Sequence, residues 1–234
     1  MQPPLHVLHA DNHVLAVAKP AGAPTVPDES GDVSLLDVAR EWVRVTYQKP
    51  GAVFLGVVHR LDRPVSGVVL FARTSKGAAR LAEAFRAHTA RKQYVGLVPR
   101  TPAQAAGEVR QWLVKDNERN QVSAVAPNTP GARAAHTHWR VLVAARGGAP
   151  GALVLAPETG RPHQLRLACV ALGAPLLGDL RYGATAPLPD RSIGLHAWRL
   201  EVPHPTLGTS LTVTAPLPSL GVWDAAREAL AVGS

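Results

Sequence analysis

Short apolar runs alternate with polar, Gly- and Pro-rich segments along most of the chain, a pattern typical of many strands and few helices. Near the start, the runs LHVLHAD and HVLAVAK contain β-branched residues and are separated by Asp11-Asn12, which is turn chemistry for a β-hairpin. Residues 19–30 are too rich in Pro and Gly to form a helix or strand. We therefore expect the fold to begin with two strands and a loop.

Apolar residues at helical spacing predict three helices. The first runs from Ser34 to Tyr47, and the second from Ser75 to Ala90, each with its initial Ser as a candidate N-cap. The third spans Gln164–Leu172 and is closed by Gly173, a residue type that favours helix C-termini.

The remaining apolar runs predict strands. They cover residues 56–58, 67–72, 93–98, 109–115, 121–125, 135–144, 152–157, 194–202 and 209–214. Because strands outnumber helices and no regular βαβ alternation occurs, we expect an α+β fold with a central mixed, largely antiparallel sheet flanked by helices.

The charge composition of the chain indicates which class of partner it binds. The 234 residues include 25 Lys and Arg against 17 Asp and Glu, which gives a formal charge of +8 and a sequence pI near 10.4. Such a surplus favours a polyanion such as nucleic acid. Solubility or a genomic bias toward Arg is the alternative explanation of the charge.

The low cysteine content and the absence of a signal sequence or a long apolar stretch indicate the cellular compartment. The single cysteine, Cys169, forms no intramolecular disulfide and supplies no paired thiolates for a zinc finger, so we expect a small core residue. The N-terminus shows no secretory signal, and no apolar stretch approaches the roughly 20 residues of a membrane span. We expect a cytoplasmic protein without membrane contact.

The densest polar cluster is HRLDR at residues 59–63, between two apolar strands and followed by Ser66-Gly67. One interpretation is a functional loop. The other is structural, with Asp62 capping a turn and the arginines solvated.

A second cluster, ETGRPHQLRLACVALGAPLLGDLRYG, begins where the third helix starts. It places Arg161, His163, Gln164 and Arg166 within one turn, which favours an anion-binding or carboxylate-pairing site. An ordinary capped helix with surface arginines is the alternative. We expect His163 to orient a neighbour by hydrogen bonding rather than to act as an acid or base.

Several chemistries lose support. The phosphate-binding GxxxxGK[ST] and dinucleotide-binding GxGxxG patterns are absent, and Ser66-Gly67 lacks the G-x-S-x-G elbow. His136 and His138 share a strand face, but no third ligand stands near them in sequence. We therefore expect surface histidines and no metal.

Five ordered segments carry a family resemblance. HRLDRPVSGVVLFART resembles the HRLDxxTSGxxLxA signature of the RluA family of pseudouridine synthases. HADNHVLAVAKPAGAPTVP, RKQYVGLV, the 158–183 cluster and LHAWRLEVPHPTLGTSLTVTAPLP resemble other segments of the family in the same order, over residues 7 to 218. Val65 and Ala168 depart from the family's usual Thr and His.

The resemblance implies that a uridine in rRNA or tRNA is isomerised to pseudouridine without a cofactor or metal. It implies that Asp62 is the nucleophile, with attack at C1′, attack at C6 and a glycal route all open. Tyr94 is implied to pack on the uracil and to serve in proton transfer, and Arg166 to pair with the aspartate. Arg60 is implied to fill the gap left by a flipped uridine, a step that costs a few kcal/mol.

Further RNA contacts are expected around this centre, from His59, Arg63, Arg161, His163 and Gln164. Because the match begins within the first ten residues, we expect a single catalytic domain over residues 1–234, with a catalytic cleft, no separate S4 RNA-binding domain, and a monomeric state. The alternative is a catalytically inactive RNA-binding or ribosome-assembly protein on the same fold, against which the joint retention of Asp62, Tyr94 and Arg166 argues.

Overall fold

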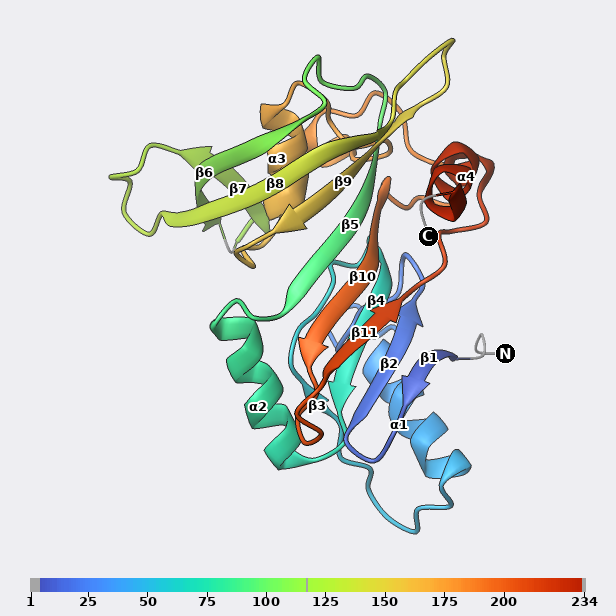
Figure 1. The fold of residues 1–234 in the computed structure, drawn as a ribbon. Helices are drawn as coiled ribbons and strands as arrows, with labels where there is room; N and C mark the ends of the chain where they lie inside the picture. Colours follow the sequence, from blue (N-terminus) through green and yellow to red (C-terminus); the bar gives the residue numbers. More distant parts are fainter. Residues whose placement is uncertain (1–4, 117, 233–234) are drawn as a thin grey trace. The chain divides into compact units, whose positions relative to one another are not determined.

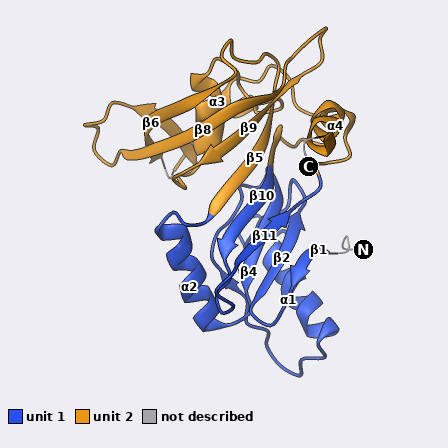
Figure 2. Cartoon of the chain, viewed as in Figure 1, with its two compact units in different colours: residues 1–90, 197–216 blue, residues 91–196, 217–234 orange. Residues whose placement is uncertain are grey.

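The computed structural model describes residues 5–116 and 118–232, which fold into two compact units (Figures 1 and 2). The first unit comprises residues 1–90 and 197–216, and the second comprises residues 91–196 and 217–234. The expectation of one catalytic domain over residues 1–234 stays a prediction.

A largely antiparallel set of strands forms the sheet of the first unit. Strand β2 (Val14–Lys19) lies between β1 (His6–Ala10) and β4 (Ser66–Ala72), and the short β3 (Gly56–Val57) also pairs with β4. Strand β10 (Leu195–Pro203), most of which belongs to this unit, lies next to β4 and pairs with β11 (Ser210–Thr214). The unit also contains helices α1 (Leu35–Thr46) and α2 (Ser75–Arg86).

Local chemistry explains the first hairpin and the first helix. The Asp11 carboxylate accepts hydrogen bonds from the backbone N–H groups of His13 at 2.7 Å and Val14 at 2.9 Å, which forms the β1–β2 turn as predicted. The Ser34 hydroxyl accepts from the N–H of Asp37 at 3.2 Å and caps α1, also as predicted.

The prediction for α2 was right about its first residue, Ser75, but wrong about its N-cap and its end. Thr74, not Ser75, is the N-cap, because its hydroxyl accepts from the Gly77 N–H at 3.0 Å. The helix ends at Arg86 because His88 adopts a left-handed conformation (φ 58°) and the Ala90 N–H turns back to the Ala84 carbonyl. That closure is a helix C-terminal motif normally made with Gly or Asn.

Both faces of the sheet in the first unit are buried, since consecutive residues of β4 all lie away from solvent, and one of the two faces carries a large hydrophobic cluster. Residues of β2, β4, β10 and β11 pack with Leu81 of α2 in a single buried cluster: Val14, Ala16, Val68, Leu70, Ala72, Leu81, Ala90, Leu200, Val202, Val213 and Ala215. Burying such side chains stabilises the unit by roughly 1.5–3 kcal/mol for each large aliphatic residue.

The strands of the other unit continue the same sheet, and five of them pair antiparallel. These five strands lie in the order β5 (Arg91–Val98), β9 (Gly151–Pro157), β8 (Arg133–Val143), β6 (Ala106–Asp116) and β7 (Gln121–Val125).

Helix α3 (Gln164–Ala171) contacts β6, β8 and β9, and its Cys169 is fully buried, as predicted. The 3-10 turns at Leu180–Tyr182 and Gly221–Trp223 and the helix α4 (Asp224–Val232) were not predicted.

The predicted α+β class is confirmed, since the described chain combines a large, mostly antiparallel set of strands with four α-helices. The expected catalytic cleft stays a prediction. Among the described residues, no helix is both long enough and apolar enough to cross a membrane.

Candidate active site

The HRLDR cluster lies in the loop between β3 and β4 of the first unit, with Asp62 half-buried. The backbone just before Asp62 is fixed by Thr25. The Thr25 hydroxyl donates to the Leu61 carbonyl at 2.9 Å and accepts from the Leu61 N–H at 3.2 Å, in a buried environment. Both polar groups of the Leu61 backbone are therefore satisfied by one side chain, and the position of the loop is set there.

The backbone just after Asp62 is fixed by Lys19, which is 1% exposed. Its Nζ donates to the carbonyls of Arg63 at 3.0 Å, Pro20 at 3.0 Å and Ala23 at 2.6 Å. Burial lowers the pKa of Lys19 to about 7, while the negative charge of Asp62 acts in the opposite direction. The Lys19 side chain thus folds back onto carbonyls of its own turn and also binds the loop that contains Asp62.

Arg63 pairs with a neighbouring acidic loop. Its guanidinium contacts the carboxylates of Asp28 at 2.9 Å and Asp32 at 2.5 Å, and the Ser30 hydroxyl at 2.5 Å. The Ser30 hydroxyl and Arg63 hold the pKa of Asp28 at about 2. Arg63 therefore links residues 28–32 to the loop, and the RNA contact expected of it stays a prediction.

His59 is held inside the unit. Its Nε2 accepts from the Leu70 N–H of β4 at 2.9 Å, so the neutral ring carries its proton on Nδ1. The ring stacks on Phe85 of α2 at 4.8 Å between centroids. Arg60, the next residue, is exposed, as a side chain that enters RNA must be. The RNA contacts of both residues stay predictions.

The turn that follows Asp62 needs a glycine. The Val65 N–H donates to the Asp62 carbonyl at 3.0 Å, and Gly67 has a φ of 120°. A β-carbon at Gly67 would lie 2.2 Å from the carbonyl oxygen of Ala197 on β10. The Val65 side chain, which stands where the family usually has Thr, is buried and has no hydroxyl to donate a hydrogen bond. The loop is held instead by backbone hydrogen bonds and by the side chains of Thr25 and Lys19.

In the second unit, Arg166 of α3 is buried and forms a bidentate ion pair. Its Nε and Nη2 contact the Asp179 carboxylate at 2.7 Å and 2.6 Å. Its guanidinium also lies over the Tyr182 ring, 4.7 Å from the centroid. The carboxylate-pairing interpretation of this cluster thus has a partner that sequence reasoning did not name, although Asp179 stands in the quoted GDLRYG segment.

The other residues of this cluster organise the start of α3. The His163 Nδ1 lies 2.7 Å from the Tyr182 hydroxyl, which agrees with an orienting role. The buried Gln164 side chain accepts from the Thr159 hydroxyl and the Arg161 N–H, and donates to β8. The RNA contacts expected of these residues stay predictions.

The three proposed catalytic residues come from different elements. Asp62 belongs to the first unit, whereas Tyr94 of β5 and Arg166 of α3 belong to the second. Tyr94 is half-buried and lies opposite Leu155 of β9 in the sheet register. Their convergence, and the pairing of Arg166 with Asp62, stay predictions.

Comparisons with known proteins agree with the sequence resemblance. A model of the RNA pseudouridylate synthase family matches residues 13–171. The dual-specificity RNA pseudouridine synthase RluA of Escherichia coli K12 is 34% identical over 221 residues, which cover 92% of this chain and 94% of RluA. The ribosomal large subunit pseudouridine synthase D of Nitrosomonas europaea is 33% identical, and the match covers 92% of this chain but 62% of that protein.

Solved structures give the same result at the level of the fold. Human RNA pseudouridylate synthase domain containing 4 has a TM-score of 0.76 at 25% identity, with 95% of this chain and 92% of that chain covered. Human RNA pseudouridylate synthase domain containing 1 has a TM-score of 0.73 at 26% identity, with 96% and 90% covered. The chain therefore belongs to the RluA family of RNA pseudouridine synthases.

Proposed function

We propose that this RNA pseudouridine synthase isomerises a uridine within an rRNA or tRNA stem-loop, with Asp62 as the nucleophile. The observation that carries the proposal is the fixation of the loop on both sides of Asp62, by Thr25 before it and by Lys19 after it. A nucleophile held in one position avoids much of the entropy cost of reaching its target, which is the role expected of a catalytic loop.

The reaction requires one carbon–nitrogen bond to break and one carbon–carbon bond to form. The bond from C1′ to N1 of uracil breaks, the base turns, C1′ bonds to C5, and the C5 hydrogen is lost as a proton while N1 gains one. A carboxylate at Asp62 is suited to this chemistry because it is anionic and has neighbours that position its backbone. We assign Tyr94 to the uracil face and to the proton transfer, and Arg166 to the Asp62 carboxylate.

We assign RNA binding to the excess of Lys and Arg over Asp and Glu. A net charge of +8 favours phosphate contacts, and exposed Arg60 stands two residues before Asp62, where it is suited to replace the flipped base in the stack. The relative named for the ribosomal large subunit supports rRNA within the proposed substrate class, and the name of RluA supports RNA in general. We assign tRNA as the other member of that class, and with it a cytoplasmic setting. We further assign a monomeric state.

Asp62→Asn tests the nucleophile because it preserves size and removes the negative charge. Release of tritium from C5-labelled uridine in RNA from cells that lack the gene measures turnover without knowledge of the target. We expect Asp62→Asn to abolish release and to bind RNA like the wild type, with exposed Glu228→Gln as the matched control that retains release. Substantial release by Asp62→Asn would exclude Asp62 as the nucleophile.

The same assay separates the second candidate function, a catalytically inactive RNA-binding or ribosome-assembly protein. Absence of release by the wild type, with RNA bound, would favour that candidate. RNA affinity over a salt series and the fluorescence of a base analogue at the target site then test the basic surface. We expect a steep fall of affinity with salt, and for Arg60→Ala a larger loss of base flipping than of binding.

A further inference from the structure

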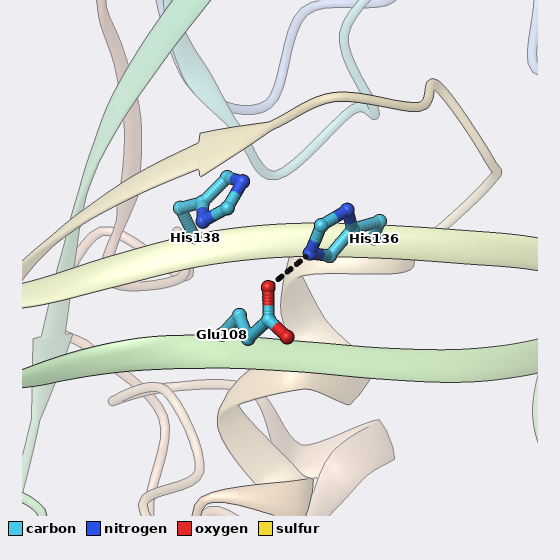
Figure 3. A group of neighbouring side chains, drawn as sticks. All are labelled: Glu108, His136 and His138. Carbon is cyan, nitrogen blue, oxygen red and sulfur yellow. Dashed lines mark hydrogen bonds and ion pairs between the residues drawn. The ribbon is translucent and has the colours of Figure 1, made fainter.

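Two strands of the second unit, β6 and β8, bring two histidines and a glutamate together on one sheet face (Figure 3). His136 and His138 alternate along β8, so both side chains leave the sheet on the same side. Glu108 of β6 stands directly opposite His138 in the antiparallel register, and its carboxylate reaches the His136 Nε2 at 2.9 Å. The sequence separation of Glu108 from the histidines hides this third group, and the sheet register supplies it.

We propose that Glu108, His136 and His138 bind a divalent transition-metal ion, with Zn²⁺ as the best match. Two imidazoles and one carboxylate form the type of ligand set that zinc accepts, and they leave a fourth position for water. One ligand atom from each residue lies within 4.8 Å of the other two. Tetrahedral zinc with bonds of about 2 Å holds its ligand atoms about 3.3 Å apart, so closure needs side-chain shifts of about an ångström.

Glu158 supplies the outer carboxylate that metal-bound histidines normally have. It follows β9, and its two carboxylate oxygens contact the His136 Nδ1 at 2.5 Å and the His138 Nε2 at 2.6 Å. Both rings therefore direct one nitrogen to Glu158, which leaves the His136 Nε2 and the His138 Nδ1 for the metal. A carboxylate that accepts the second ring N–H orients a histidine ligand and increases its basicity.

The surroundings allow an ion to enter. The side chains of Glu108 and His138 are 44% and 48% exposed, so neither is closed off from solvent. Arg110, two residues along β6, contacts the Oε1 of Glu108 at 3.0 Å and also donates to its Oε2 at 3.3 Å, the oxygen that lies 2.9 Å from the His136 Nε2. A bound ion would therefore replace Arg110 at Oε2 and leave it paired with Oε1. With Glu158 also ionised, the two carboxylates balance the charge of a divalent cation, and the bound ion would link β6, β8 and the end of β9.

The test is a Zn²⁺ titration of the tag-free full chain after removal of metal by a chelator, followed calorimetrically and by Co²⁺ absorption. We expect one equivalent to bind with visible Co²⁺ bands, and His138→Ala and Glu108→Gln each to lower the Zn²⁺ affinity at least 10-fold. Glu158→Gln should lower it by about 10-fold through the rings it orients. His6→Ala, on exposed β1, is the matched control and should bind like the wild type.

Either of two results would overturn the assignment. One is a failure of the Zn²⁺ titration, either because the wild-type protein binds no Zn²⁺ at concentrations where pairs of histidines bind it, or because the His138→Ala variant binds Zn²⁺ as tightly as the wild type. The other is Mg²⁺ binding as tight as Zn²⁺ binding, which would indicate carboxylates alone. Because no RNA is present in the titration, these results are independent of the isomerase assay.

Discussion

Lys19→Met is the sharpest test of how the loop that contains Asp62 is held. Methionine keeps the length and the apolar stem of the side chain but removes the ammonium that donates to Pro20, Ala23 and Arg63. The Arg63 carbonyl keeps a second donor, the Gly22 N–H at 2.8 Å. The principal loss therefore falls on the carbonyls of Pro20 and Ala23, whose hydrogen bonds to Lys19 are only partly buried, so each costs at most the roughly 1–3 kcal/mol of a buried group that loses its partner.

Removal of a buried charge offsets part of this cost. Burial lowers the pKa of Lys19 from 10.5 to about 7, so at neutral pH the folded protein bears the penalty of holding a charged amine. We expect the free energy of unfolding at pH 7 to fall by about 2 kcal/mol in Lys19→Met, measured by urea denaturation. Exposed Lys76→Met on α2 should leave it unchanged.

The pH dependence gives a second, independent readout. Between pH 7 and 10 the unfolded chain keeps the Lys19 proton and the folded chain releases it, so wild-type stability rises with pH while Lys19→Met lacks this contribution. The difference between the two proteins should widen by about 2 kcal/mol from pH 7 to pH 9. Parallel stability curves over that range, or a loss below about 0.5 kcal/mol at pH 7, would refute the reasoning.

Three further changes test other contacts. Asp179→Asn removes the carboxylate of the buried bidentate ion pair with Arg166, and we expect a loss of about 3–5 kcal/mol in urea denaturation. Gly67→Ala places a β-carbon 2.2 Å from a backbone oxygen at a positive φ, and we expect at least about 2 kcal/mol of destabilisation, measured as a drop in Tm. Although partial burial opposes the shift, hydrogen bonds from two histidine rings and two backbone N–H groups hold the pKa of Asp11 below its usual range. Asp11→Asn should therefore destabilise at pH 7, and the difference from the wild type should shrink as the pH falls below about 4.

Each of these has a result that would count against it. Wild-type stability of Asp179→Asn would show that Arg166 is held by other groups. Gly51→Ala, where a β-carbon meets nothing within 4 Å, is the control for Gly67, and equal effects of both changes would exclude the steric explanation. For Asp11, a stability difference that stays constant from pH 7 to pH 3 would show that its carboxyl titrates normally.

Local patterns were sufficient for most of the fold. Alternating apolar residues and the Asp11-Asn12 turn predicted the first hairpin, and the Gln121–Val125 strand was predicted with its exact bounds. The end of α2 was missed because His88 takes the left-handed conformation usually given to Gly, so no residue signalled the stop. Helix α4 was missed because it is short and follows the last recognised motif, although its residues are amphipathic.

The candidate site was harder to predict from the sequence, because the residues that hold its loop lie far from it along the chain. Residues 59–63 fitted a functional loop and a structural turn equally well, and the structure shows elements of both, since Arg63 pairs with Asp28 and Asp32 while Asp62 lies between two fixed peptides. Lys19 and Thr25 precede that loop by some forty residues, and only folding shows that they bind it. The same holds for Asp179 beneath Arg166.

The rate at which a thiol reagent labels Cys169 measures how often α3 opens. Burial, together with the negative charge of Asp179, raises the pKa of the Cys169 thiol to about 12, so a thiol reagent meets neither an exposed nor an ionised sulfur in the folded state. Labelling then requires α3 to separate from its sheet, and its rate reports how often that happens. Arg166 lies one helical turn before Cys169 on α3. The labelling rate of Cys169 in the wild-type protein therefore measures the local stability of the helix that carries Arg166, without an added probe.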